Sequence, residues 1–192
     1  MKRSNIKSLL FIPTLLFAFT VKLYSAGEEA EPIKVDWSFK GITGKFDRAS
    51  LQRGFQVYKE VCSSCHSMQY LSYRNLGEPG GPEFSEEQVK AIAASIEITD
   101  GPDEQGEMFT RPGRPSDKFK NPYPNVKASI AANGGAYPPD MSVLVKARPG
   151  GSNYIYSVLV GYEDPPEGVT MDDGVYYNKY MIGNNIKMAS PL

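Results

Sequence analysis

Residues 61–66, which read VCSSCH, contain both cysteines and the only histidine of the 192-residue chain. Cys62 and Cys65 stand three positions apart, and His66 follows the second cysteine directly. Three chemistries use such a pattern: a redox-active dithiol, a zinc site, and covalent attachment of a c-type haem. The sequence around the motif distinguishes these three chemistries, and the chemistry in turn predicts the fold.

The haem interpretation fits the surroundings best. In a thiol–disulfide oxidoreductase the cysteine pair opens a helix that follows a strand, whereas here it comes at the end of a predicted helix. A zinc site at this motif would lack a fourth ligand, because the sequence has no second Cys or His pair. In a c-type haem site, Cys62 and Cys65 form the two thioethers and His66 is the iron ligand. An exported thiol–disulfide oxidoreductase that uses Cys62 and Cys65 is kept as a remote alternative.

Hydrophobic periodicity predicts the helix that leads into the motif. Leu51, Phe55, Tyr58 and Cys62 recur at intervals of four, three and four residues, which puts them on one face. Ser50 is suited to cap the start of this helix. The cysteines therefore lie at the C-terminal end of an amphipathic helix.

The rest of the chain predicts a mainly α fold with long ordered loops. A second helix is indicated in 85–98 by a capping box of Ser85 and Gln88 and by an apolar stripe. Shorter helices are expected in 125–135 and 152–162. Beyond Asp100 the loops are rich in glycine and proline but carry many aromatic residues, so a large buried prosthetic group is expected to hold them.

The N-terminus predicts export. Residues 1–26 run from basic to apolar to small side chains, as in a secretory signal peptide, and leave a domain of residues 27–192. The apolar run falls short of the roughly 20 residues that span a bilayer, although a retained N-terminal anchor stays open. Without residues 1–26 the chain is about five units negative, which argues against nucleic-acid binding because phosphates require clustered Lys and Arg.

No histidine remains for the other face of the iron, so the sixth ligand is a methionine, an unusual Lys, Asn or Tyr, or an open position. Methionine is favoured for electron transfer because its thioether stabilises ferrous iron. Met68 is too close to His66 in the chain to reach around the ring. The remaining internal candidates are Met108, Met141, Met171, Met181 and Met188. Met188 has one local argument, since a proline-stiffened segment follows it.

The stretch RGFQVYKEVCSSCHSMQYLSYRNL, residues 53–76, resembles the haem-attachment region of the cytochrome c1 family. The resemblance continues through AANGGAYPPD and KARPGGSNY to YYNKYMIGNNIKMASPL, residues 176–192. It covers the chain from about residue 34 to the end. It implies a cytochrome c-like haem domain built around one covalent haem c.

The resemblance also implies individual roles. Cys62 and Cys65 match the thioether cysteines, and His66 and Met188 match the two axial iron ligands. Ser190 departs mildly from the family's Met-Ala-Pro-Pro pattern. The residues that match the propionate contacts are Arg148 and Tyr154, and those that match the haem pocket are Asn133, Pro138 and Pro139.

The family's activity is electron transfer within the respiratory cytochrome bc1 complex, a ubiquinol–cytochrome c oxidoreductase. The resemblance implies partners: cytochrome b, a Rieske iron–sulfur subunit that reduces the haem, and a soluble cytochrome c that takes the electron. It implies the periplasmic face of a bacterial inner membrane, and a subunit that is not catalytic alone. Because the family continues past the axial methionine with a helix and a membrane anchor, we expect that the sequence is incomplete at Leu192. A free periplasmic cytochrome c is the alternative.

Overall fold

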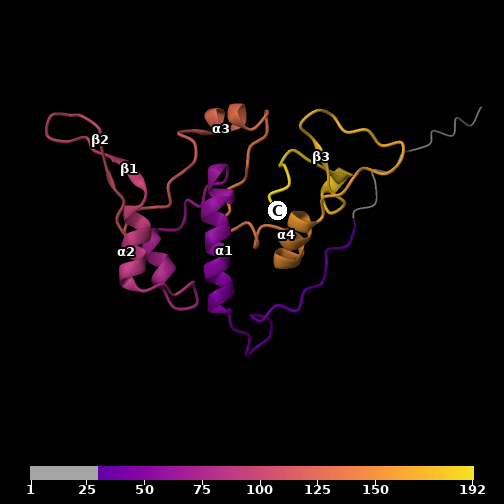
Figure 1. The fold of residues 1–192 in the computed structure, drawn as a ribbon, viewed down its shortest axis with the longest axis horizontal. Helices are drawn as coiled ribbons and strands as arrows, with labels where there is room; N and C mark the ends of the chain where they lie inside the picture. Colours follow the sequence, from indigo (N-terminus) through magenta and orange to yellow (C-terminus); the bar gives the residue numbers. More distant parts are fainter. Residues whose placement is uncertain (1–29) are drawn as a thin grey trace, which may run out of the picture.

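A computed structural model describes residues 30–192, and the predicted signal peptide, 1–26, lies outside the described residues. The fold is mainly helical with long loops, as the sequence predicts (Figure 1). Its helices are α1 (Arg48–Glu60), α2 (Glu86–Ala94), α3 (Val126–Ala132) and α4 (Gly151–Val160), with short 3-10 turns at Cys62–Ser64, Tyr73–Gly77 and Ile182–Asn184. Two small antiparallel pairs complete it: β1 (Glu97–Asp100) with β2 (Phe109–Pro112), and β3 (Tyr176–Tyr177) with β4 (Asn185–Ile186).

Helix α1 forms where the apolar periodicity predicts it, but its cap differs from the expectation. Asp47, not Ser50, is the N-cap: its carboxylate accepts a hydrogen bond of 2.6 Å from the Ser50 amide. A carboxylate at this position satisfies one of the free amides of the first turn. The predicted face is the inner one, since Tyr58 is buried and Phe55 packs against the core.

Helix α2 covers the other side of that core. Ser85 and Gln88 form the predicted capping box, and the apolar stripe of the helix faces inward, with Val89 and Ala93 buried. A cluster of buried side chains joins α1, α2, the 3-10 turn between them and the loop after β2 through Tyr58, Tyr73, Leu76, Val89, Ala93 and Phe119. The ring of Phe119 lies 5.8 Å from that of Tyr58 and 4.8 Å from that of Tyr73.

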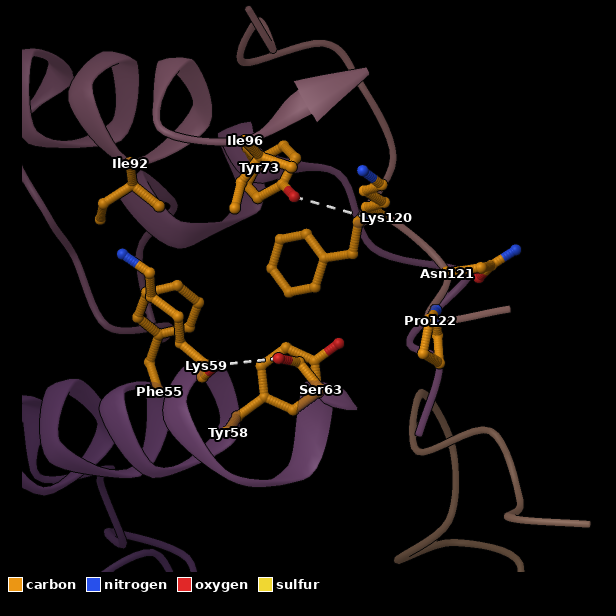
Figure 2. A pocket seen from close by; sticks show the side chains of 11 residues that line it. Phe55, Tyr58, Lys59, Ser63, Tyr73, Ile92, Ile96, Lys120, Asn121 and Pro122 are labelled. Carbon is orange, nitrogen blue, oxygen red and sulfur yellow. Dashed lines mark hydrogen bonds between the residues drawn. The ribbon is translucent and has the colours of Figure 1, made fainter. Parts of the chain in front are cut away.

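The aromatic cluster surrounds an open cavity of about 200 Å³ (Figure 2). Side chains of α1, including Phe55 and Tyr58, form one wall, and Ile92 and Ile96 line the opposite side. Ser63 is the only residue of the VCSSCH motif that lines it. The cavity therefore belongs to the core between α1 and α2, beside the motif.

A second packed region lies around α4, on the other side of α1 (Figure 1). It is organised by hydrogen bonds: the Ser157 hydroxyl accepts from the Ile33 amide at 2.7 Å, and the Asn153 side chain accepts from the Trp37 indole at 2.7 Å. Asn178 is fully buried and donates to the Val158 carbonyl at 2.7 Å. The residues before α1 are thus bonded along α4.

The β1–β2 hairpin extends from the end of α2, far from α4 (Figure 1). Its base is held by Arg111, whose guanidinium binds both carboxylate oxygens of Asp117, at 2.7 and 3.0 Å, and also pairs with Asp100. Across residues 30–192, no helix has the length and apolar character needed to cross a bilayer.

Candidate haem site

The VCSSCH motif forms one tight turn directly after α1. The amides of Cys65 and His66 both donate to the Cys62 carbonyl, at 3.1 and 2.8 Å. Both cysteines are free and half-buried. Because the chain wraps around one carbonyl, two thiols and one imidazole leave the backbone within a single turn, as attachment of a c-type haem requires.

The His66 ring is oriented by a backbone carbonyl from a distant segment. Its Nδ1 lies 2.8 Å from the Pro139 oxygen. A carbonyl only accepts hydrogen bonds, so Nδ1 carries the proton and donates it. Nε2 keeps its lone pair and makes no hydrogen bond within the described part of the chain, which is the state of a histidine that ligates a metal.

The competing chemistries fit less well. Burial raises the pKa of the Cys62 thiol, whereas a nucleophilic thiol of an oxidoreductase has a lowered pKa at a helix N-terminus. Cys62 instead follows the C-terminal end of α1. Nowhere in residues 30–192 do three His, Cys, Asp or Glu side chains gather as a metal site would need.

The predicted pocket residues Asn133, Pro138 and Pro139 lie in the loop that follows α3, and this loop reaches the motif. Pro139 provides the carbonyl for His66, and Pro138 lines a cavity of about 100 Å³ together with Cys65. Asn133 also stabilises the end of α3, because it is the C-cap residue and its side chain donates to the Ser129 carbonyl at 2.7 Å. The loop therefore lies beside Cys65 and the His66 imidazole.

Asp140 fastens this loop to the residues after His66. Its carboxylate accepts hydrogen bonds from the Ser67 hydroxyl at 2.7 Å, the Gln69 amide at 2.9 Å and the Ser142 amide at 2.9 Å. Burial raises the pKa of Asp140, and the hydrogen bonds from Ser142, Gln69 and Ser67 outweigh it, so that the pKa falls to about 2. Asp140 is therefore ionised at neutral pH.

Met188 is attached to the same loop through its neighbour. The Lys187 ammonium donates to the Gly134 carbonyl at 2.9 Å, and the Tyr162 hydroxyl donates to the Met188 carbonyl at 2.9 Å. Figure 1 shows the C-terminal segment returning to the middle of the molecule. The segments that carry His66 and Met188 are thus both bonded to the loop after α3.

The other methionines have different surroundings. Met141 packs against the aromatic core, as does Met68. Met108 is 60 % exposed in the loop of the β1–β2 hairpin. Met181 accepts a hydrogen bond of 3.3 Å from the Tyr154 hydroxyl. Within residues 30–192, Met108, Met171 and Met188 neither pack against the aromatic core nor accept a hydrogen bond through sulfur.

Arg148 makes no hydrogen bond with the motif among residues 30–192, and the Tyr154 hydroxyl donates to Met181. Arg148 is exposed in the loop before α4, where its guanidinium donates to the Ala147 carbonyl at 3.3 Å. Tyr154 lies in the first half of α4 with its hydroxyl directed at Met181. A role for either residue at a propionate stays a prediction.

Sequence reasoning missed Asp140 and Tyr162. Asp140 had a local signal, since an Asp after two prolines with a Ser two positions later is typical of an Asx turn, and the Ser142 amide does bond its carboxylate. The contact of its carboxylate with Ser67 has no such signal, because 73 positions separate the two residues. The same holds for Tyr162, whose partner is 26 positions away.

Comparison with known proteins finds the same resemblance across the described chain. A model of the cytochrome C1 family matches residues 37–192. The chain is 53 % identical over 156 residues to "Cytochrome c1-2, heme protein, mitochondrial" of Solanum tuberosum, covering 81 % of this chain and 59 % of that protein. It is 49 % identical over 175 residues to "Cytochrome c1" of Rhodospirillum rubrum, covering 83 % and 63 % respectively.

A third relative is longer. The chain is 51 % identical over 175 residues to "Cytochrome b/c1" of Bradyrhizobium diazoefficiens, with 81 % of this chain and 26 % of that protein covered. The chain thus spans about a quarter of this relative and about three-fifths of the two others.

Proposed function

The chain belongs to the cytochrome C1 family, and we propose that it transfers single electrons through one covalently bound haem c. The observation that carries the proposal is the His66 ring. Its Nδ1 is engaged by the Pro139 carbonyl, so Nε2 is free to ligate iron beside two free cysteines of the same turn. The name of the Solanum relative, a heme protein, supports the same cofactor.

Each residue of the proposed haem site has a separate role. Cys62 and Cys65 would hold the haem through thioethers, and His66 Nε2 would ligate its iron. The Met188 thioether would be the second iron ligand and would favour the ferrous state. When bound, the haem supplies one-electron chemistry between ferrous and ferric iron. Arg148 and Tyr154 are proposed to bind its propionates, since a guanidinium fork matches a carboxylate.

Membership of the family supports the electron path and the partners that we propose. The electron comes from a Rieske iron–sulfur subunit and leaves to a soluble cytochrome c, with cytochrome b as the third partner, at the periplasmic face of a bacterial inner membrane. The Bradyrhizobium relative, named cytochrome b/c1, supports an association with cytochrome b. A free periplasmic electron carrier is the second candidate, and co-purification of cytochrome b with the chain distinguishes the two.

The first experiment is a haemochrome spectrum of the exported protein, purified from a host that matures c-type cytochromes. We expect a c-type spectrum with the haem retained after acid–acetone extraction. Replacing Cys62 and Cys65 together by Ala makes the haem extractable, whereas Ser63→Ala leaves it attached. A wild-type protein without covalent haem, but with an active dithiol, would favour the oxidoreductase alternative.

A further inference from the structure

We propose that Asp140 is a positioning residue for the His66 imidazole, because it fastens together the two segments that the His66–Pro139 hydrogen bond joins. Within residues 30–192, Asp140 accepts no hydrogen bond from the ring or the cysteines. It directly follows Pro139 and bonds Ser67, which directly follows His66. The inference deepens the proposed function, since the orientation of this ring governs the iron ligand.

The contacts of the carboxylate span both segments. One oxygen, Oδ2, accepts from the Ser67 hydroxyl at 2.7 Å and from the Gln69 amide at 2.9 Å. The other, Oδ1, accepts from the Ser142 amide at 2.9 Å and so holds its own turn in shape. Ser67 is adjacent to His66, and Asp140 is adjacent to Pro139. A single side chain therefore links the chain immediately after the imidazole to the chain immediately after its acceptor.

Backbone hydrogen bonds complete the connection. The Met141 amide donates to the Ser67 carbonyl at 2.8 Å, and the Tyr70 amide donates to the Ser142 hydroxyl at 3.1 Å. Ser67 is 8 % exposed, so its bond with Met141 is shielded from water, whereas the Tyr70–Ser142 bond is exposed. The His66–Pro139 hydrogen bond is thus the first link in a short ladder between two segments that are 73 positions apart.

The ladder depends on a carboxylate at position 140. Three donors converge on its two oxygens, and an ionised carboxylate has acceptor sites for all of them. No Lys, Arg or His within residues 30–192 forms an ion pair with Asp140. The hydrogen bonds from Ser67, Gln69 and Ser142 are what stabilise its charge, and hydrogen bonds to charged groups are the strong ones.

An asparagine side chain at this position could not accept hydrogen bonds from all three donors. Asparagine has nearly the shape of aspartate, but one of its two terminal atoms donates instead of accepting. In Asp140→Asn, either the Ser142 amide or the pair of Ser67 and Gln69 loses its acceptor. The two segments then separate more readily, and the His66 Nδ1–H exchanges with solvent more often. A weaker bond at Nδ1 also makes the imidazole a poorer electron donor to iron.

The test uses the full exported chain with its haem, and isotope-labelled histidine. Because His66 is the only histidine, nitrogen NMR reports on this ring alone. We expect Asp140→Asn to raise the solvent exchange rate of the Nδ1–H by roughly tenfold or more, and to shift the midpoint potential to more positive values. Asp103→Asn is the matched control, since Asp103 also accepts from two backbone amides, those of Gln105 and Glu107, but lies in the distant hairpin loop.

A purely structural role would lower the melting temperature of Asp140→Asn and leave Nδ1–H exchange and the potential as in the control. That result would overturn the proposal. If Asp140→Asn does not fold, Ser67→Ala tests the proposal instead, because it removes only the hydroxyl that donates to Asp140. It should change both readouts in the same direction and by less, and no change in either would also overturn the proposal.

Failure of the proposed function is distinguishable from failure of this inference. If the wild-type protein carries no covalent haem, the proposed function fails. The nitrogen shifts and the Nδ1–H exchange of His66 still report on the ring in the haem-free protein. Asp140→Asn is then compared with wild type by exchange alone, with the same expected acceleration.

Discussion

A backbone carbonyl, not a side chain, orients the residue on which the haem site depends. The Pro139 oxygen holds His66 Nδ1 at 2.8 Å, so replacing the Pro139 side chain leaves the acceptor atom in place. Other residues hydrogen-bond the segments that carry the two iron-ligand candidates. Asp140 bonds Ser67, which follows His66, and Tyr162 bonds the Met188 carbonyl.

Tyr162 is expected to hold the Met188 segment through the bond from its hydroxyl to the Met188 carbonyl, 2.9 Å long. A typical hydrogen bond contributes about 1 kcal/mol, so Tyr162→Phe should speed displacement of Met188 by added cyanide about fivefold. The thioether–ferric charge-transfer band should remain. Stopped-flow absorbance after mixing with cyanide measures the rate.

Two further variants serve as references for the Tyr162→Phe experiment. Met188→Ala should abolish the charge-transfer band and lower the midpoint potential. Tyr176→Phe is the matched control, because Tyr176 is 42 % exposed and its hydroxyl makes no hydrogen bond among the described residues. An unchanged band in Met188→Ala would show that another group ligates the iron. Equal rates in Tyr162→Phe and Tyr176→Phe would show that the hydroxyl bond does not hold the segment.

Among the elements, the β1–β2 hairpin carries an ion-pair network centred on Arg111. The Arg111 guanidinium, 15 % exposed, bridges Asp117 and Asp100 at the base of the hairpin. The hydrogen bond from Arg111 lowers the pKa of Asp117 to about 2. The hairpin therefore has a connection to the core that acid can break.

Asp117→Asn should destabilise the protein at neutral pH, and the difference from wild type should shrink in acid. A carboxyl with a lowered folded pKa contributes its full stability above its unfolded pKa of about 3.9 and loses it as the pH falls. The gap in melting temperature should thus be constant from pH 7 to about 5 and narrow between about 4 and 2. Thermal unfolding followed by circular dichroism measures it.

The control is Glu86→Gln in α2. Glu86 pairs with Lys90 on the surface, where the two side chains are 75 % and 61 % exposed. Such pairs contribute little to stability, so this variant should melt like wild type at every pH. A gap for Asp117→Asn that is as wide at pH 2 as at pH 7 would mean that charge is not what holds the hairpin.

At the scale of the whole molecule, two regions of unlike packing lie on either side of α1. One is the aromatic cluster of α1 and α2, where apolar side chains are contiguous. The other surrounds α4 and is organised by polar groups such as Ser157 and Asn178, with Val158 and Tyr180 as its buried apolar side chains. Fewer apolar side chains are buried in the second region of residues 30–192, so we expect it to be less stable by itself.

Loss of haem attachment should therefore affect the two regions differently. In Cys62→Ser/Cys65→Ser, the amides of α1 and α2 should keep most of their protection from hydrogen exchange. The amides of α4 and of the C-terminal segment should lose it, because the proposed haem would provide much of their apolar contact. Hydrogen exchange with mass spectrometry compares this variant with the haem-loaded wild type, and uniform loss in both regions would contradict the expectation.

Much of the fold was accessible from local sequence patterns. The apolar spacing around Phe55 and Tyr58 places α1, and the capping box at Ser85 places the start of α2. These patterns involve only residues that are close in the sequence, so they can be recognised without knowing how the rest of the chain folds. The first cap was assigned wrongly, because Asp47 and Ser50 both suit an N-cap and only the backbone conformation separates them.

The amino-acid sequence by itself determined the attachment motif and the membership of the family, because Cys62, Cys65 and His66 are neighbours and their spacing is a covalent property of the chain. Only the tertiary structure decided which groups hold that motif. Pro139 and Asp140 meet His66 and Ser67 across 73 positions, and the Tyr162 hydroxyl meets the Met188 carbonyl across 26. Such hydrogen bonds have no sequence period, since they form between segments that fold side by side only when the whole chain closes around its core.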